Sequence, residues 1–133
     1  MNIYEIGSVR TNNLAANVGE KIGGLWQQVI TEIGPTTPIY GVYHDYETNY
    51  LGDYTLSLAV ESSETGRKII LDEGNYQIFP VELTPEDPSR NNVAETWQHI
   101  WALEQAGNLH RRYEKDYEKY EQDGSVAIYI SIE

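Results

Sequence analysis

The chain has 133 residues, no cysteine and a formal net charge of −12, with nine Lys and Arg against 21 Asp and Glu. This length suits one compact domain, and the lack of cysteine excludes disulfides, thiolate metal sites and cysteine nucleophiles. The acidity excludes the cationic surface that duplex nucleic acid requires, so no direct nucleic-acid binding is expected. No secretory leader follows Met1, and no apolar run approaches the roughly 18 residues of a membrane span. We therefore expect a cytoplasmic protein with no membrane contact.

Hydrophobic periodicity predicts two helices and several strands along the chain. The predicted elements are, in order, a strand at 2–11, a helix at 16–33, strands at 39–47 and 54–61, a hairpin of 68–72 and 74–83, a helix at 92–106, and strands at 113–120 and 126–132. Apolar residues recur at helical spacing from Ile22 to Ile33 and from Val93 to Trp101. Gly34-Pro35 is expected to stop the first helix. Pro80 cannot donate to a ladder, which predicts a sheet edge or a bulge.

Two copies of one unit are recognisable in the sequence. Four features recur in one order at nearly one spacing: Trp26 and Trp97 (71 positions), Tyr4 and Tyr76 (72), Tyr40 and Tyr113 (73), and the apolar runs opening at Tyr54 and Val126 (72). On these spacings Glu118 corresponds to Asp45. We expect strand-helix-strand-strand half-repeats at about 1–66 and 67–133, related by a pseudo-two-fold axis. The fold class is α+β, with two helices on one side of an antiparallel sheet and a ligand cleft between the repeats.

Most familiar catalytic and cofactor motifs are absent from the sequence. There is no glycine-rich phosphate loop and no Gly-x-Ser-x-Gly elbow, and His44, His99 and His110 lack paired metal spacing. We therefore expect no metal and no cofactor.

Aromatic residues interleaved with acids are the remaining signal. The chain has eleven Tyr and three Trp but one Phe. Aromatic faces attract cations, and a buried carboxylate supplies a counter-charge, so such a set is typical of an organic-cation site. The alternative is that each Trp is a core residue and that most of the acids form a solvated face.

Four stretches resemble the GyrI-like effector-binding family, which includes the effector-binding domains of AraC-type and MerR-type bacterial regulators. These stretches are residues 40–54, 96–101, 116–120 and 127–132. The resemblance implies a duplicated frame with a ligand cleft, and a pocket acid at Glu118 that meets cationic, lipophilic ligands. Unlike the regulators, this chain contains no helix-turn-helix segment, so we expect a stand-alone member.

Three functions follow from these patterns and the resemblance. The first is binding of aromatic, often cationic compounds in multidrug or toxin sensing or protection, with regulation through a separate DNA-binding protein as a possible extension. The expected ligand-binding residues are Glu118, Trp26, Trp97, Trp101, Tyr43, Tyr54 and Tyr120. The second is hydrolysis of strained cyclopropanoid toxins, with Glu118 as general base and Tyr43 placing the leaving oxygen. The third is an acidic protein inhibitor of the DNA gyrase type.

Overall fold

One antiparallel sheet of seven strands, with two helices, makes up the part of the chain that the computed structural model describes, which is residues 2–12, 16–33, 39–48, 52–61, 67–71, 75–81, 93–121 and 125–133. The elements are β1 (Asn2–Thr11), α1 (Val18–Ile33), β2 (Ile39–His44), β3 (Tyr54–Val60), β4 (Arg67–Ile70), β5 (Tyr76–Pro80), α2 (Val93–Gln105), β6 (Asp116–Tyr120) and β7 (Val126–Ser131). The predicted helix stop at Gly34-Pro35 lies outside the described residues.

The order of the strands confirms the predicted fold class and its duplication. The sheet runs β4-β1-β3-β2-β6-β7-β5, so β2 and β6 lie side by side at its centre. On either side follow β3 and β7, and then β1 and β5, as two strand-helix-strand-strand units related by a pseudo-two-fold axis require. Strand β4 is an addition beside β1. The half-repeat boundary near residues 66 and 67 stays a prediction.

The strand register corrects the correspondence between the two halves. Tyr43 pairs with Leu56, and Glu118 pairs with Ile128. Leu56 and Ile128 are 72 positions apart in the sequence, which makes Glu118 the counterpart of Tyr43 and not of Asp45. Glu118 was matched to the wrong residue because the second half holds three extra residues ahead of β6.

The predicted strand at 113–120 was correspondingly too long. Strand β6 begins at Asp116. Tyr113 lies before it with a φ of 56°, in the left-handed region that strands do not use. The proposed equivalence of Tyr40 and Tyr113 is therefore also wrong, since Tyr40 lies within β2.

The predicted hairpin of β4 and β5 was wrong as well. Strand β4 pairs with β1, and β5 pairs with β7, so the two strands lie at opposite edges of the sheet. These longer-range pairings bury Ile69 and Phe79, which a two-stranded ribbon by itself would not do. The edge position predicted from Pro80 is confirmed, because β5 is an outermost strand.

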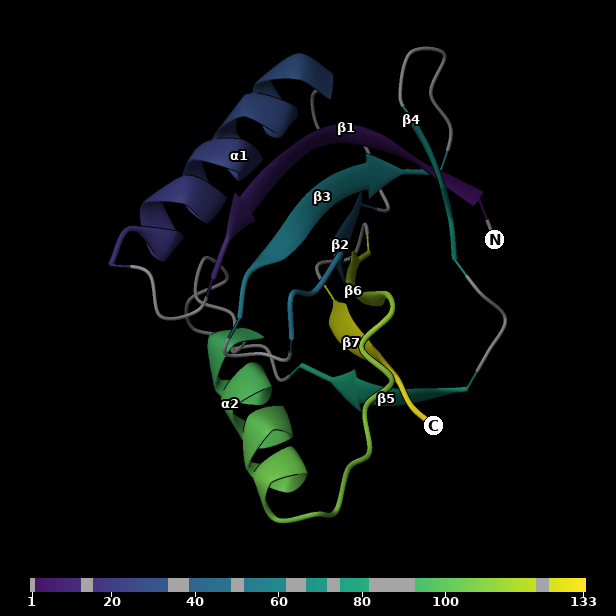
Figure 1. Cartoon of the computed structure of the whole chain (residues 1–133). Coiled ribbons are helices and arrows are strands. Elements are labelled where there is room, and N and C mark those ends of the chain that lie inside the picture. Colours follow the sequence, from purple (N-terminus) through teal and green to yellow (C-terminus); the bar gives the residue numbers. More distant parts are fainter. Residues whose placement is uncertain are drawn as a thin grey trace.

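Both helices cover the same face of the sheet (Figure 1). Leu25 and Val29 of α1 pack with Leu56 and other residues of β3. On α2, Trp97 and Ile100 pack with residues of β5 and β7 in a second cluster. A third cluster covers the opposite face, and it includes Tyr40, Val42, Ala59 and Tyr117. Neither α1 nor α2, the helices in the described ranges, is long and apolar enough to cross a membrane.

Gly7 permits the close approach of α1 to β1. A Cβ at this position would lie 2.9 Å from Leu25 Cδ1 and 3.2 Å from Val29 Cγ2. We expect Gly7→Ala to lower the free energy of unfolding by about 1 kcal/mol, because the added methyl overpacks this contact. A Cβ added at Gly24 of α1 would meet no side chain within 4 Å, and Gly24→Ala should instead raise stability by about 0.5–1 kcal/mol. Urea denaturation measures both variants, and a Gly7→Ala protein as stable as wild type would contradict this account of the contact.

Candidate ligand-binding site

A cavity of about 630 Å³ lies between the two helices, over the centre of the sheet. All seven residues predicted to bind ligand line it. They are Trp26 from α1, Trp97 and Trp101 from α2, Tyr43 from β2, Tyr54 from β3, and Glu118 and Tyr120 from β6. The structure thus brings the predicted set together, while their role in binding stays a proposal. Seven further lining residues were not in that set: Val18, Gly19, Ile22, Tyr46, Val93, Gln98 and Arg111.

Glu118 projects from the middle of β6 toward this cavity. Alternation along β6 places Glu118 and Tyr120 on one strand face, and their contacts agree, because the Tyr120 hydroxyl donates to Glu118 and both residues line the cavity. Across the sheet, Glu118 pairs with Gly41 of β2. A Cβ on Gly41 would come within 3.3 Å of Glu118 Oε1, so the absence of a side chain there leaves room for the carboxylate.

Three neutral donors hold the Glu118 carboxylate, which is 2% exposed. Trp97 Nε1 donates to Oε2 at 2.6 Å, and the Tyr43 hydroxyl donates to the same oxygen at 3.0 Å. The Tyr120 hydroxyl donates to Oε1 at 2.7 Å. Among the described residues, no Lys or Arg forms an ion pair with Glu118. The carboxylate is therefore hydrogen-bonded but has no counter-charge within the part of the chain that the structure describes.

Burial raises the pKa of Glu118 above its ordinary value, although the hydrogen bonds from Trp97, Tyr120 and Tyr43 oppose the rise. Burial and the nearby Glu118 charge also raise the pKa of Tyr43 and of Tyr120 well above 10.0. For Tyr54, burial and Glu118 raise the pKa to about 12. These phenols thus remain protonated near neutral pH, and Tyr43 and Tyr120 act there as hydrogen-bond donors.

Aromatic rings contact one another around the carboxylate. The Tyr43 ring lies 5.1 Å from Trp97 and 5.4 Å from Tyr54, and Trp26 meets Tyr120 edge-to-face at 4.8 Å. Such contacts hold the rings in place and leave other parts of them facing the cavity. A tryptophan can be a core residue and a cavity-lining residue at once, since Trp97 belongs to a buried cluster and also lines the cavity.

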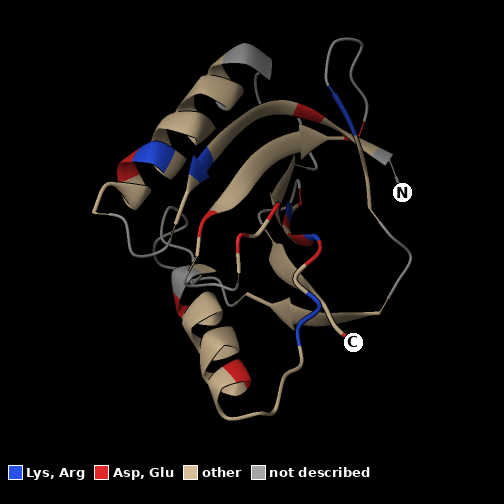
Figure 2. Ribbon diagram, in the orientation of Figure 1, with Lys and Arg blue, Asp and Glu red and all other residues tan. Residues whose placement is uncertain are grey.

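Arg111 is the main site residue that sequence reasoning missed. It lies between α2 and β6 in the sequence. Figure 2 shows that the segment joining these two elements carries both basic and acidic residues. Its side chain is 1% exposed and pairs with Asp116 at 2.8 Å and with Glu104 at 3.5 Å. Burial alone would lower the pKa of Arg111, but Asp116 and the neighbouring phenols raise it overall. The only signal in the sequence was the alternation of basic and acidic residues, which is equally typical of a solvated surface.

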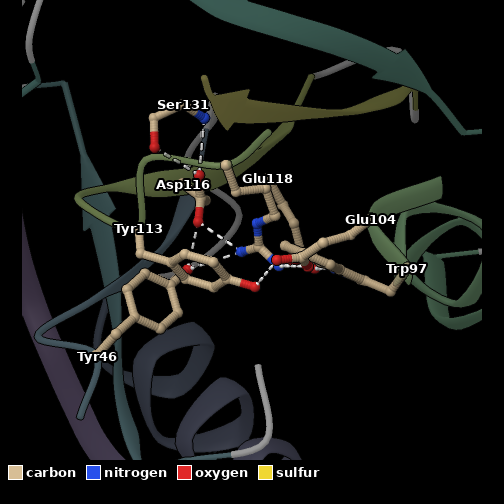
Figure 3. A network of polar contacts seen from close by, with 8 residues as sticks. Tyr46, Trp97, Glu104, Tyr113, Asp116, Glu118 and Ser131 are labelled. Carbon is tan, nitrogen blue, oxygen red and sulfur yellow. Dashed lines mark hydrogen bonds and ion pairs between the residues drawn. The ribbon is translucent and has the colours of Figure 1, made fainter. Parts of the chain in front are cut away.

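Tyr46 lies beside this pair and was missed with it. Its hydroxyl donates to Asp116 Oδ2 at 2.5 Å, and Tyr113 donates to Glu104 (Figure 3). The pKa of Tyr46 is raised well above 10.0, by burial first and by Asp116 second. Tyr46 therefore presents a neutral ring to the cavity and a donor to the ion pair behind it.

A row of polar residues resembling a hydrolytic triad lies elsewhere, across β2 and β3. His44 Nδ1 is 3.0 Å from Asp45 Oδ2, and His44 Nε2 is 2.8 Å from the Ser57 hydroxyl. Ser57, however, is fully buried and donates to Glu5 at 2.5 Å. Burial is the main cause that lowers the pKa of His44. A serine that no substrate can reach is not a nucleophile, so this row is structural.

Comparison with known proteins places the chain in a family. No curated protein sequence matches it. An integron cassette protein from the mobile metagenome of Vibrio cholerae has a similar structure, with 23% identity and a TM-score of 0.80 over all of this chain and 90% of the other. The structure of SAV2435 bound to tetraphenylphosphonium is also similar, with 15% identity and a TM-score of 0.70 over all of this chain and 88% of the other. These likenesses support the effector-binding fold that the sequence motifs predicted. The family model described as Cass2, integron-associated effector binding protein, matches residues 5–132, and the chain belongs to this family.

Proposed function

We propose that this protein binds a small, aromatic, lipophilic cation in the cavity between α1 and α2, with Glu118 as the counter-charge. One observation carries the proposal: Glu118 is 2% exposed, and every hydrogen bond that it receives from the described residues comes from a neutral group. A buried ion without an opposite charge is costly, and a bound cation would remove that cost.

The aromatic lining supports the same ligand class. The rings of Trp26, Tyr43 and Trp97 stand within reach of one cavity, so a ligand with aromatic substituents would bury apolar surface against them. Their faces also attract a desolvated cation. SAV2435, a structural relative, was captured with tetraphenylphosphonium, a permanent cation that carries four phenyl groups. We propose that sensing of such compounds, or protection by sequestering them, is the biological role.

Binding accounts for the geometry of Glu118 better than hydrolysis does. A carboxylate has about four lone-pair positions, and three of those on Glu118 accept hydrogen bonds from the described residues. The one remaining position suits a single ligand contact. A general base would need that position for water and would still lack a counter-charge during the reaction.

The pH dependence of binding tests the proposal. Only the charged form of Glu118 attracts the ligand, and burial sets its pKa above the ordinary 4.5. We therefore expect the affinity for tetraphenylphosphonium, which does not titrate, to rise with pH through a midpoint above 4.5 and then reach a plateau. Calorimetric titration at several pH values measures this. An affinity that stays constant across the range would contradict the role of Glu118.

The raised pKa of Glu118 makes the stability of the ligand-free protein fall with rising pH, whereas the affinity for the ligand rises. Because its pKa is raised in the folded state, Glu118 favours folding when protonated. This contribution to stability is fully present below its ordinary pKa and is lost as the pH rises through the raised value. We expect the bound cation to restore it, so the thermal stabilisation produced by the ligand should grow as the pH rises.

A further inference from the structure

Arg111 occupies an aromatic and acidic box of the same kind as the one proposed for the ligand. Figure 3 labels the residues that form this box, Tyr46, Trp97, Tyr113 and Asp116. Its guanidinium carbon lies 4.3 Å from the centroid of the Tyr113 ring and 5.8 Å from those of Tyr46 and Trp97. The Oδ2 atom of Asp116 lies 2.8 Å from Nη2 of the guanidinium. The chain thus fills this second box with a cation of its own.

The two boxes share a wall. Trp97 donates its indole N–H to Glu118 at 2.6 Å, while its ring also faces Arg111. Tyr46 and Trp97 line the cavity, and both rings contact the guanidinium. A ligand that extends from Glu118 toward Tyr46 would therefore approach the guanidinium of Arg111, which itself lines the cavity.

The carboxylates of Asp116 and Glu118 differ in how many of their lone-pair positions already accept a hydrogen bond. Asp116 Oδ2 accepts hydrogen bonds from Arg111 and Tyr46, and Oδ1 accepts two more from the backbone N–H and hydroxyl of Ser131. These four bonds use all the lone-pair positions of a carboxylate. The Glu118 carboxylate, which lines the cavity, accepts three from the described residues, so one of its positions remains for a ligand.

We infer that Arg111 is a specificity-determining residue that restricts the ligand to a single cationic centre. This inference rests on the proposed function and names its ligand class more narrowly. A second cationic centre would have to compete with Arg111 for the carboxylates of Asp116 and Glu104, and it would find no free acceptor on Asp116. A compound with one cationic centre and a neutral remainder would pair with Glu118 and leave the contacts of Arg111 unchanged.

Two synthetic probes of matched shape test this inference. The dication is 1,4-bis(trimethylammoniomethyl)benzene, and its partner carries a neopentyl group in place of one of the two trimethylammoniomethyl groups, so that carbon replaces one charged nitrogen. We expect wild-type protein to bind the monocation at least about tenfold more tightly than the dication, measured by calorimetry at low salt. Equal affinities would overturn the inference while leaving the proposed function intact. If the monocation itself does not bind, the proposed function fails, and the inference fails with it.

Arg111→Gln provides the second arm of the test. Removing the guanidinium leaves Asp116 without its cation, so we expect the preference for the monocation to shrink at least about tenfold. Arg112→Gln is the matched control, because it removes the same charge from a side chain that pairs with Glu114 at 3.4 Å and does not line the cavity. Its preference should equal that of wild type. An unchanged preference in folded Arg111→Gln protein would overturn the inference, and if that variant does not fold, the wild-type affinity ratio decides.

Discussion

Replacing Glu118 with Gln should weaken the binding of tetraphenylphosphonium by more than a hundredfold without unfolding the protein. The side chain keeps its shape and loses its charge. Removing one partner of a buried charge pair typically costs about 2–5 kcal/mol of binding free energy, and a hundredfold loss of affinity corresponds to about 3 kcal/mol. The amide oxygen can accept the hydrogen bonds that Trp97 and Tyr43 now donate to Oε2. The Tyr120 hydroxyl, which donates to Oε1 in the wild type, can rotate to accept one from the amide nitrogen.

The stability of this variant separates a loss of ligand from a loss of fold. The substitution removes a buried negative charge that has no counter-charge among the described residues. At pH 8 and without ligand, the free energy of unfolding of the variant should therefore equal or exceed that of wild type. Glu121→Gln is the matched control, because Glu121 pairs with Lys119 at 2.9 Å and does not line the cavity. It should bind the cation as wild type does. A Glu118→Gln protein with unchanged affinity would remove the basis for the proposed function.

Removing the carboxylate of Asp116 should have the largest effect on stability. Asp116→Ala leaves the buried guanidinium of Arg111 with only the longer ion pair to Glu104 at 3.5 Å among the described residues, and breaking a buried pair from one side typically costs about 3–5 kcal/mol. It also leaves the donors of Tyr46 and Ser131 without their acceptor. Urea denaturation should show this loss as a lower midpoint with an unchanged slope.

Two further variants identify the cause of that loss. Glu114→Ala breaks an ion pair with Arg112 that is partly exposed and 3.4 Å long, so its effect should stay within about 1 kcal/mol. Combining Asp116→Ala with Arg111→Met also removes the buried positive charge that has lost its Asp116 partner, so part of the stability should be recovered. If the double variant is no more stable than Asp116→Ala, the loss comes from packing and hydrogen bonds instead of the unpaired charge.

The faces of the strands and helices were predictable because they depend on local periodicity. Alternation in β3 places Tyr54 and Leu56 on one side and Ala59 on the other, and the clusters that contain them lie on opposite faces of the sheet. The helical spacing of Trp97 and Trp101 likewise turns both toward one cluster. Since both helices cover the same face, side chains predicted one by one converge on a single cavity.

The choice of strand partners was not predictable from the same patterns. Turn residues near 72–75 permit a hairpin, but that choice depends on what each strand can bury elsewhere in the fold. Ile69 pairs with Ile3, and Phe79 pairs with Ile128, across long separations in the sequence. Three extra residues ahead of β6 also shifted the repeat, so only the register related Glu118 to Tyr43.

The sequence by itself determined the fold class, the duplication and the aromatic and acidic character of the cavity, because periodicity and residue type are local properties. Only the tertiary structure decided that Glu118 lies over Gly41 with no counter-charge among the described residues, and that Arg111 is buried. The surroundings of Arg111 come from Glu104 in α2, Tyr46 after β2 and Asp116 in β6. Whether a charge is buried depends on which distant elements enclose it, and that is settled when the sheet and the helices pack together.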